Sequence, residues 1–363
     1  KKIEKSFFLI GDAGGSKIGE TSNALKALKK HTSSLNTDGD YTLFLGDNIY
    51  PSGLPEKKSN SRELAEHRLD VQIEAMSDFN GKTVFIPGNH DWYNNGLKGL
   101  KREEDYIEKA LKDKNAFQPE KGCPIEKINV SDNIVILALD TQWYITDWDK
   151  HPTINDECEI KSRNEFILEV EGELKKNGTK TILIAMHHPA YTNGSHGGYF
   201  NANKHLFPFS PYIPLPGIGS LAVQIRSQGG VSPQDRYNYR YNDLMERLVT
   251  LSKNNERVVF VSGHEHSLQY IEHDGVKQIV SGSGSKETAT SLGNDGKFAF
   301  GGQGFAVFNV FDDGSSEVSY YSAENGEPKL LYQTSVFQSP EPYDVSKLPS
   351  NFNPVRNISA YKK

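Results

Sequence analysis

The sequence predicts an α/β fold in which a second sheet packs on the first. Short apolar runs end repeatedly in a glycine or a polar cluster, and amphipathic stretches lie between them. Apolar runs of this length are typical of strands covered on both faces, and their alternation with helices is typical of an α/β core. After residue 277 the pattern changes to strands alone, at 278–280, 305–311 and 317–321, which indicates the second sheet.

Five of the apolar runs lead directly into a side chain that can bind a metal ion. The pairs are residues 6–10 before Asp12, 41–45 before Asp47, 83–87 before Asn89, 181–185 before His187, and 258–261 before His264. Polar groups at the ends of strands in an α/β sheet gather at one edge, where ligands bind. The pattern therefore predicts a single site at the strand ends.

Three stretches have apolar residues at helical spacing, which predicts amphipathic helices. Their expected buried faces are Leu64, His67, Val71, Ala75 and Phe79; then Phe166, Val170 and Leu174; then Leu244, Leu248 and Leu251.

The chain divides into one large domain, residues 1–335, and a polar, proline-bearing tail or linker, residues 336–363. Residues 194–241 are rich in Gly, Pro, Tyr and Phe, and this irregular segment is too long for a simple connection, so it is a candidate wall of a site. The tail offers a means of attachment to a further domain.

Charge and hydropathy exclude some classes of partner. The net charge of −6 gives no support to a nucleic-acid partner. No apolar run approaches the roughly 20 residues that a transmembrane helix needs. Cys123 and Cys158 both lie in loop-like stretches, and either a disulfide in an oxidising compartment or two free thiols fits them. We expect an extracytoplasmic location, whether secreted, periplasmic or outer-surface.

The side chains at the strand ends suit a particular metal chemistry. Carboxylates, an amide and imidazoles together favour Fe, Zn or Mn over metals that prefer thiolates. One carboxylate can bridge two ions, and two ions can hold the attacking and leaving oxygens of a phosphoryl transfer. A lone Gly-Asp after a strand is usually a turn or a helix cap. Five such motifs at successive strand ends favour a metal site.

The motifs also resemble a known family. Gly11-Asp12-Ala13-Gly14, Gly46-Asp47-Asn48-Ile49-Tyr50, Gly88-Asn89-His90-Asp91, Ile184-Ala185-Met186-His187 and Gly263-His264-Glu265-His266 are similar to the five-block signature of purple acid phosphatases. The chain resembles the small, mammalian-type branch of that group, within the calcineurin-like metallophosphoesterase superfamily, over about residues 6–325. The resemblance implies a four-layer α/β/β/α sandwich of two packed mixed sheets flanked by helices.

One departure separates this branch from other metallophosphoesterases. Those typically carry a metal-binding histidine two residues after the first aspartate, where this chain has Gly14. Tyr50, three residues after Asp47, can replace it as a phenolate. The resemblance implies two metal ions. The first is Fe(III), held by Asp12, Asp47, Tyr50 and His266; the second is Fe(II), Zn(II) or Mn(II), held by Asp47, Asn89, His187 and His264.

The resemblance also implies the reaction, which is hydrolysis of a phosphomonoester substrate by a metal-bound hydroxide. His90 and His196 are the expected catalytic residues, which stabilise charge or protonate the leaving group. Ser195 departs from the acidic residue common at that position. His188 occupies a place usually held by tyrosine and is a candidate second-layer residue.

Two alternatives remain open at this stage. In the first, the substrate is a phosphodiester, a nucleotide or a phospholipid headgroup, and its pocket is lined by Tyr199, Phe200, Phe207, Phe209 and Tyr212. Packing of the loop against the protein is the favoured explanation of these aromatic residues. Otherwise, the chain is a metal-stabilised binding module tethered to another domain or an outer-membrane structure. The presence of His90 and His196 argues against that second alternative, because a scaffold needs no proton donor.

Overall fold

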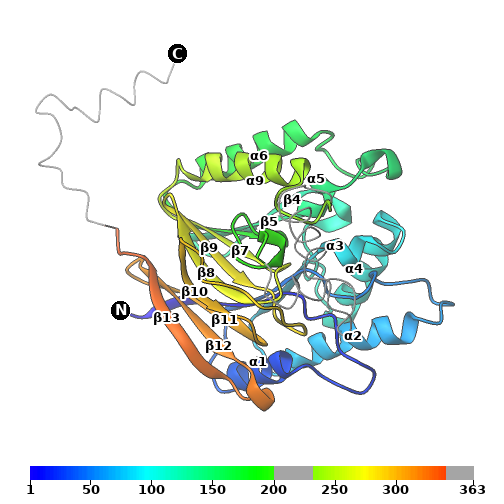
Figure 1. Cartoon of the computed structure of the whole chain (residues 1–363), viewed down its shortest axis with the longest axis horizontal. Coiled ribbons are helices and arrows are strands. Elements are labelled where there is room, and N and C mark those ends of the chain that lie inside the picture. Colours follow the sequence, from blue (N-terminus) through cyan, green and yellow to red (C-terminus); the bar gives the residue numbers. More distant parts are fainter. Residues whose placement is uncertain (200–231, 341–363) are drawn as a thin grey trace, which may run out of the picture.

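The computed structural model describes residues 1–199 and 232–340, which form two packed sheets covered by helices (Figure 1). The six-stranded sheet has the order β13-β12-β11-β1-β2-β3, and the seven-stranded sheet has the order β10-β8-β9-β7-β6-β5-β4. Both sheets are mixed: β1, β2 and β3 are parallel to one another, as are β5, β6, β7 and β9, while the remaining pairs are antiparallel. The predicted sandwich of two mixed sheets is confirmed, but the strands after residue 277 do not form the second sheet by themselves. β11 and β12 extend the sheet of β1, and β9 joins the sheet of β5, β6 and β7.

The strands and helices have the following bounds. The first sheet contains β1 (Ile3–Ile10), β2 (Tyr41–Leu45), β3 (Lys82–Ile86), β11 (Gly304–Phe311), β12 (Ser316–Ser322) and β13 (Lys329–Phe337). The second contains β4 (Ile125–Asn129), β5 (Ile134–Leu139), β6 (Thr181–Met186), β7 (Val258–Ser262), β8 (Leu268–His273), β9 (Val276–Ser281) and β10 (Gly296–Phe300). The α-helices of the described residues are α1 (Asn23–Ser33), α2 (Arg62–Ala75), α3 (Asn89–Trp92), α4 (Leu97–Leu111), α5 (Thr141–Ile145), α6 (Arg163–Lys176) and α9 (Tyr239–Ser252).

Side chains along the central strands point alternately to the two faces of the sheet, and both faces are buried. In β1, Phe7 and Leu9 face the core between the two sheets, and Phe8 and Ile10 face the core under the helices. This is the period of two that a strand buried on both faces requires. Figure 1 shows α6 and α9 on one side of the sheets and α1 and α2 on the other. The helices therefore close both outer faces.

Two of the three predicted helical faces need adjustment. The α6 prediction is confirmed, since Phe166, Val170 and Leu174 are all buried. In α9 the residues Leu244 and Leu248 are buried, but Leu251 is only partly covered. The prediction for α2 is confirmed in part. Val71 and Ala75 are buried, but Leu64 and His67 are only partly covered, and the helix ends at Ala75, before the buried Phe79.

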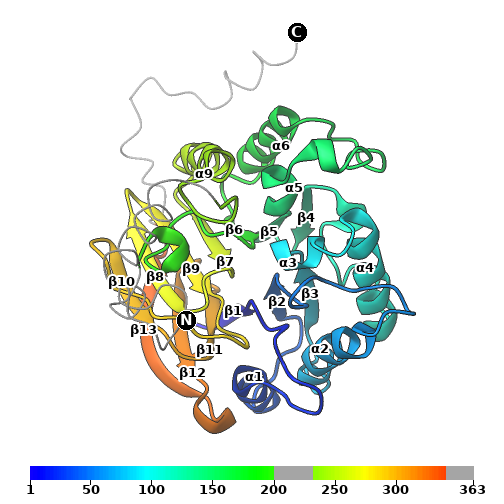
Figure 2. The same cartoon turned by 45° about the vertical axis from the view of Figure 1, so that its right-hand side comes forward.

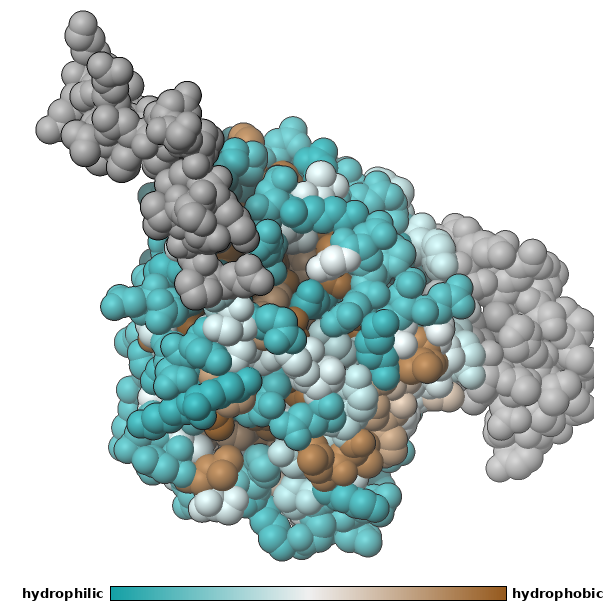
Figure 3. Space-filling model, turned by 90° about the vertical axis from the view of Figure 1, so that its left-hand side faces the viewer, coloured by the Kyte–Doolittle hydropathy of each residue, from teal (hydrophilic) through white to brown (hydrophobic). Residues whose placement is uncertain are grey.

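Several features bear on the remaining expectations. The strand β13 ends at Phe337, and residues 341–363 of the expected tail lie outside the described part of the chain, as do Phe200, Phe207, Phe209 and Tyr212. Cys123 and Cys158 form a disulfide bond. None of the described helices is long and apolar enough to span a membrane. The face in Figure 3 is mostly hydrophilic, with its apolar residues in separate groups.

Candidate metal centre

Five strand ends from the two sheets meet at one place. Asp12 follows β1, Asp47 follows β2, Asn89 opens α3 after β3, His187 follows β6 and His264 follows β7. Figure 2 shows β1, β2 and β3 lying side by side with β5, β6 and β7 opposite them. The parallel direction of these strands brings their carboxyl ends to the same edge, as the sequence pattern predicted.

The backbone is unusual at three of these positions. Asp12, Asp47 and His264 have φ values of 56°, 54° and 66°, in the left-handed region that residues with a Cβ rarely adopt. Such conformations cost free energy, persist only where the surroundings enforce them, and are common at functional sites. Each of the three residues lies two positions after the end of its strand, so the unusual backbone occurs where the chain leaves the sheet.

One group of donor atoms forms around Asp12. The hydroxyl of Tyr50 lies 2.7 Å from Oδ1 of Asp12 and 3.1 Å from Nε2 of His266. Nε2 of His266 is itself 3.4 Å from Oδ1 of Asp12. Burial, followed by the negative charges of Asp12 and Asp47, raises the pKa of Tyr50 well above its usual value. A strong positive charge is therefore needed to ionise this phenol.

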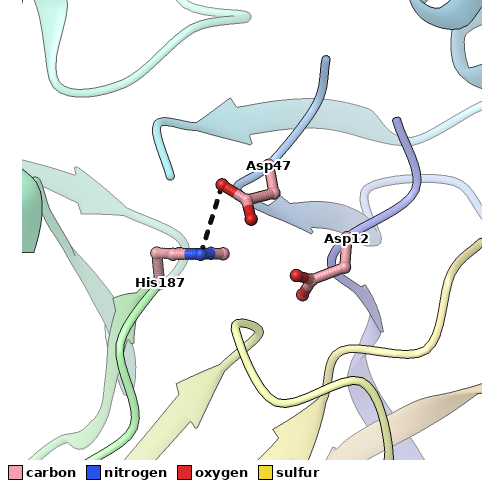
Figure 4. Close-up of side chains that lie close together, drawn as sticks. All are labelled: Asp12, Asp47 and His187. Atoms are coloured by element: carbon pink, nitrogen blue, oxygen red, sulfur yellow. Dashed lines mark ion pairs between the residues drawn. The ribbon is translucent and has the colours of Figure 1, made fainter. Parts of the chain in front are cut away.

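A second group forms around His187. Its Nε2 atom lies 3.1 Å from Oδ1 of Asn89, 3.4 Å from Oδ1 of Asp47 and 3.3 Å from Nδ1 of His264. Figure 4 shows Asp47 and His187 facing each other, with Asp12 beside them. One donor atom from each of these three residues lies within 4.8 Å of the others. Asp47 lies beside both groups, because its carboxylate also contacts Tyr50.

Hydrogen bonds fix which imidazole nitrogen faces the site. Nδ1 of His187 donates to the carbonyl oxygen of Leu45 at 2.7 Å, and Nε2 of His264 donates to the carbonyl oxygen of Gln234 at 2.8 Å. The opposite nitrogens, Nε2 of His187 and Nδ1 of His264, therefore point their lone pairs inward when the rings are neutral. This is the arrangement that a metal-binding histidine requires.

His187 and Asp47 each change the pKa of the other. Burial alone opposes ionisation of both His187 and Asp47, but their mutual attraction dominates: it raises the pKa of His187 to about 9 and lowers that of Asp47 below its ordinary range. A metal ion binds only after His187 gives up its proton. Asp47 also accepts a hydrogen bond from the backbone N–H of His90 at 2.9 Å, which holds its carboxylate in place.

Gly14 leaves no room for a side chain. A Cβ atom added there would lie 2.2 Å from the carbonyl carbon and oxygen of Asn48. The close approach is held by two backbone hydrogen bonds, from Gly14 N to Asp47 O at 3.2 Å and from Tyr50 N to Gly14 O at 3.0 Å. The loop that carries Tyr50 thus packs directly on the loop that carries Asp12, in the space that a histidine at position 14 would need.

The two predicted catalytic histidines lie at the edge of the centre. His90, in α3, donates from Nδ1 to the carbonyl oxygen of Pro51 at 2.5 Å, and its Nε2 atom is 3.9 Å from Oδ2 of Asp47. His196 lies in a 3₁₀ turn, Ser195–Gly197, and its ring packs on that of His264 with 4.1 Å between the centroids.

Two carboxylates that the sequence did not single out hold His196. Oδ1 of Asp235, a buried residue, is 2.9 Å from Nδ1 of His196. The carboxylate of Glu265, also buried, accepts hydrogen bonds from the backbone N–H groups of Ser195 and His196, both at 2.9 Å. Glu265 lies between His264 and His266, two of the predicted metal ligands, so its position in the sequence was a usable signal. Asp235 lies in the irregular segment and gave none.

His188 and Asp140 are buried near the donor groups and are held by hydrogen bonds. His188 is buried, with Nδ1 at 2.7 Å from Thr141 Oγ1 and Nε2 at 2.6 Å from Gln234 Oε1, so both its nitrogens are engaged away from the donor groups. Burial, with the charge of His187 next, lowers the pKa of His188 to about 3. Asp140 accepts from Trp92 Nε1 at 2.9 Å and from the Trp143 backbone N–H at 3.0 Å.

Comparison with known proteins identifies the family of this fold. The family model for calcineurin-like phosphoesterases matches residues 5–268, and the chain belongs to that family. It is 22% identical over 344 residues to "Purple acid phosphatase 7" of Arabidopsis thaliana. That alignment covers 91% of this chain and 85% of the Arabidopsis protein. The resemblance to purple acid phosphatases and the metallophosphoesterase fold are thus confirmed.

Solved structures share the fold at low sequence identity. One is the structure titled "GAP50 the anchor in the inner membrane complex of Plasmodium", with a TM-score of 0.61, 16% identity, and coverage of 93% of this chain and 89% of that one. Another is a purple acid phosphatase isolated from yellow lupin (Lupinus luteus) seeds, with a TM-score of 0.55 and 14% identity. This chain is 91% covered in that alignment and spans 53% of the lupin protein.

Proposed function

We propose that this protein is a two-metal phosphomonoesterase of the purple acid phosphatase type. The observation that carries the proposal is the position of the Tyr50 hydroxyl, between Asp12 Oδ1 and His266 Nε2, at 2.7 and 3.1 Å. Other metallophosphoesterases typically use a histidine two residues after the first aspartate, and Gly14 has no space for one. Tyr50 supplies the donor that would otherwise be missing.

The donor set fits two metal ions. Asp12, Tyr50 and His266 would hold the first ion; Asn89, His187 and His264 would hold the second; Asp47 would bridge them. Two carboxylates and a phenolate on one side suit a trivalent hard ion such as Fe(III). The second group has an amide oxygen and two imidazoles, which suits Fe(II), Zn(II) or Mn(II). Bound there, the ions would supply the charge that neutralises the phosphate and lowers the pKa of water.

The protein's own residues would orient the substrate and move a proton. His90 has one nitrogen fixed on the Pro51 carbonyl, so its Nε2 atom faces Asp47 and the place where a phosphate oxygen would bind. His196 would protonate the leaving alkoxide as a general acid. Asp235 would hold Nδ1–H of His196 and thus favour the tautomer in which Nε2 faces the site.

The position of Glu265 supports catalysis over a purely structural metal site. It ties the His196 turn to the backbone between two proposed ligands, His264 and His266, so the turn and the ligands keep a fixed relation. A binding module has no need of a histidine held in this way. The disulfide between Cys123 and Cys158 supports an extracytoplasmic location, where disulfides persist.

Metal content, colour and substrate choice test the proposal together. The purified protein is loaded with iron, its metals are counted by elemental analysis, and its visible spectrum is recorded. We expect two ions per chain and an absorption band from charge transfer between Tyr50 and Fe(III), absent in Tyr50→Phe. We also expect faster hydrolysis of nitrophenyl phosphate than of bis(nitrophenyl) phosphate. Two bound ions with no band would contradict the role of Tyr50, and a preference for the diester would contradict the substrate class.

A further inference from the structure

A lysine that the proposed mechanism does not use lies on the ring of Tyr50. Nζ of Lys286 is 3.2 Å from the centroid of that ring. The side chain is partly buried and comes from the segment that follows β9. An ammonium group over an aromatic face is attracted by the quadrupole of the ring, whose faces are electron-rich, and the attraction is stronger where water is partly excluded. The contact therefore joins a positive charge to a proposed metal ligand.

The backbone holds this segment against the centre at several points. Ser285 Oγ donates to the carbonyl oxygen of Asp12 at 2.5 Å, and the backbone N–H of Thr288 donates to the carbonyl oxygen of His266 at 2.8 Å. Gly284 N–H donates to the carbonyl oxygen of Gly11 at 2.9 Å. Lys286 lies between the residues that contact Asp12 and His266, and its side chain covers the third member of the group, Tyr50. These hydrogen bonds therefore fix the position of Lys286 beside the site.

Two carboxylates near Lys286 attract its ammonium group. Burial and the positive charge of Arg68 lower the pKa of Lys286, while the carboxylates of Asp12 and Asp47, acting through space, oppose that decrease. The donor group that faces the first ion contains two carboxylates and, when Tyr50 is ionised, a phenolate. A fixed positive charge beside three negative groups reduces their mutual repulsion.

We propose that Lys286 acts through Tyr50. Its fixed positive charge lies on the ring of the tyrosine and sets the energy of the electronic transition from the ring to the metal ion. The inference rests on the proposed role of Tyr50 as a ligand of Fe(III). Attraction to the ammonium grows when the phenol becomes a phenolate, because a full negative charge then lies under Nζ. Lys286 thus stabilises the ionised form that binds the metal.

This role has consequences that a lysine serving only to bind phosphate would not have. Absorption of visible light moves electron density from the phenolate ring to the metal. Because Nζ lies on the ring, it lowers the energy of the ring electrons more than that of the metal orbitals. Removing the charge should therefore shift the band to longer wavelength. Removing the charge should also lower the reduction potential of the Fe(III) ion, because the positive charge of Lys286 favours the reduced state in the wild type.

The test compares the resting, iron-loaded protein with Lys286→Met and Lys286→Gln, which remove the charge, and with Lys286→Arg, which keeps it. Lys297→Met is the matched control, because Lys297 is exposed on β10. We expect a shift to longer wavelength and a lower potential in both neutral variants, and values near those of the wild type in Lys286→Arg and Lys297→Met. The spectra are recorded without substrate, so the readout does not depend on turnover.

Two outcomes would overturn the inference and spare the proposed function. One is a wild-type band that disappears in Tyr50→Phe but stays unmoved in both neutral Lys286 variants, with the KM for nitrophenyl phosphate unchanged. The other is an unmoved band with a raised KM for nitrophenyl phosphate, which would assign Lys286 to phosphate binding. Failure of the proposed function looks different, since the iron-loaded wild type would then show no tyrosine-dependent band.

Discussion

Nδ1 of His196 lies 2.9 Å from Oδ1 of Asp235, a carboxylate that is 1% exposed. The two residues come from opposite ends of the irregular segment and meet beside the proposed metal centre. A buried carboxylate on one imidazole nitrogen orients the ring and stabilises its protonated form. Asp235 therefore places a carboxylate beside His196, whose neighbour in the sequence, Ser195, carries no charge.

The first prediction concerns this pair. His196→Ala should reduce turnover by roughly 10²-fold on a substrate with a poor leaving group, if the residue is a general acid. Asp235→Asn should give a smaller loss of the same kind, because the imidazole remains but its partner no longer carries a charge. Both losses should shrink on nitrophenyl phosphate, which needs less protonation.

Exposed Asp149 offers the control for that experiment, as Asp149→Asn. Metal content should stay unchanged in all three variants, since neither His196 nor Asp235 belongs to the donor groups. Equal losses on good and poor leaving groups would assign His196 to phosphate binding instead of proton transfer.

The second prediction concerns Asp47, the residue beside both donor groups. Asp47→Asn keeps the size of the side chain and removes its negative charge. We expect loss of at least one metal ion by elemental analysis and no measurable hydrolysis, because one carboxylate serves both ions. A variant with two ions and near-normal turnover would rule out the bridging role.

Much of the fold and the candidate site follows from local patterns. Continuous apolar runs identified the buried strands, and the polar residue after each run marked its carboxyl end. By contrast, β4, β10 and β13 were not predicted, because they are edge strands of their sheets and only partly buried. The inner strand β8 was also missed, since its sequence mixes apolar and polar residues. A strand that is neither continuously apolar nor regularly alternating gives a weak signal.

The residues that sequence reasoning missed act through long-range contacts. Asp235 contacts His196, which is 39 positions away in the sequence. Lys286 contacts Tyr50, which is also distant in the sequence. Such pairs depend on how loops from different strands pack, and no local period records that. The error in α2 has another cause: its buried face includes Arg62 and Gln72, whose long side chains bury polar groups by hydrogen bonding to backbone carbonyls.

The third prediction tests the space at Gly14. In Gly14→Ala the new Cβ would lie 2.2 Å from backbone atoms of Asn48, so one of the two ligand loops must move. We expect a loss of roughly 1–3 kcal/mol of unfolding free energy, typical of overpacking, and a weaker Tyr50-dependent band. Gly172→Ala in α6 is the control, because a Cβ there has open space and should leave stability unchanged or raise it by up to about 1 kcal/mol. Equal stability of the two variants would show that the loops are not closely packed.

The fourth prediction concerns pH and a histidine far from the proposed reaction. His31, in α1, packs on Tyr321 with 4.5 Å between ring centroids and on Phe305 with 5.5 Å. Burial lowers the pKa of His31 below its ordinary value of 6.5. Its proton is therefore bound more readily in the unfolded chain than in the folded one.

The sign of the pH effect follows from that difference. The stability tied to neutral His31 is fully present above the unfolded pKa and is lost as the pH falls through the lower, folded pKa. His31→Phe keeps an aromatic ring in the same place and cannot titrate. Denaturant unfolding of both proteins at about pH 7.5 and about pH 5 should show a smaller acid-induced loss of stability in the variant, since every other titrating group is shared. If both proteins lose the same stability between these two pH values, then His31 is protonated as easily in the folded chain as in the unfolded one, and its burial against Tyr321 and Phe305 does not act on its charge.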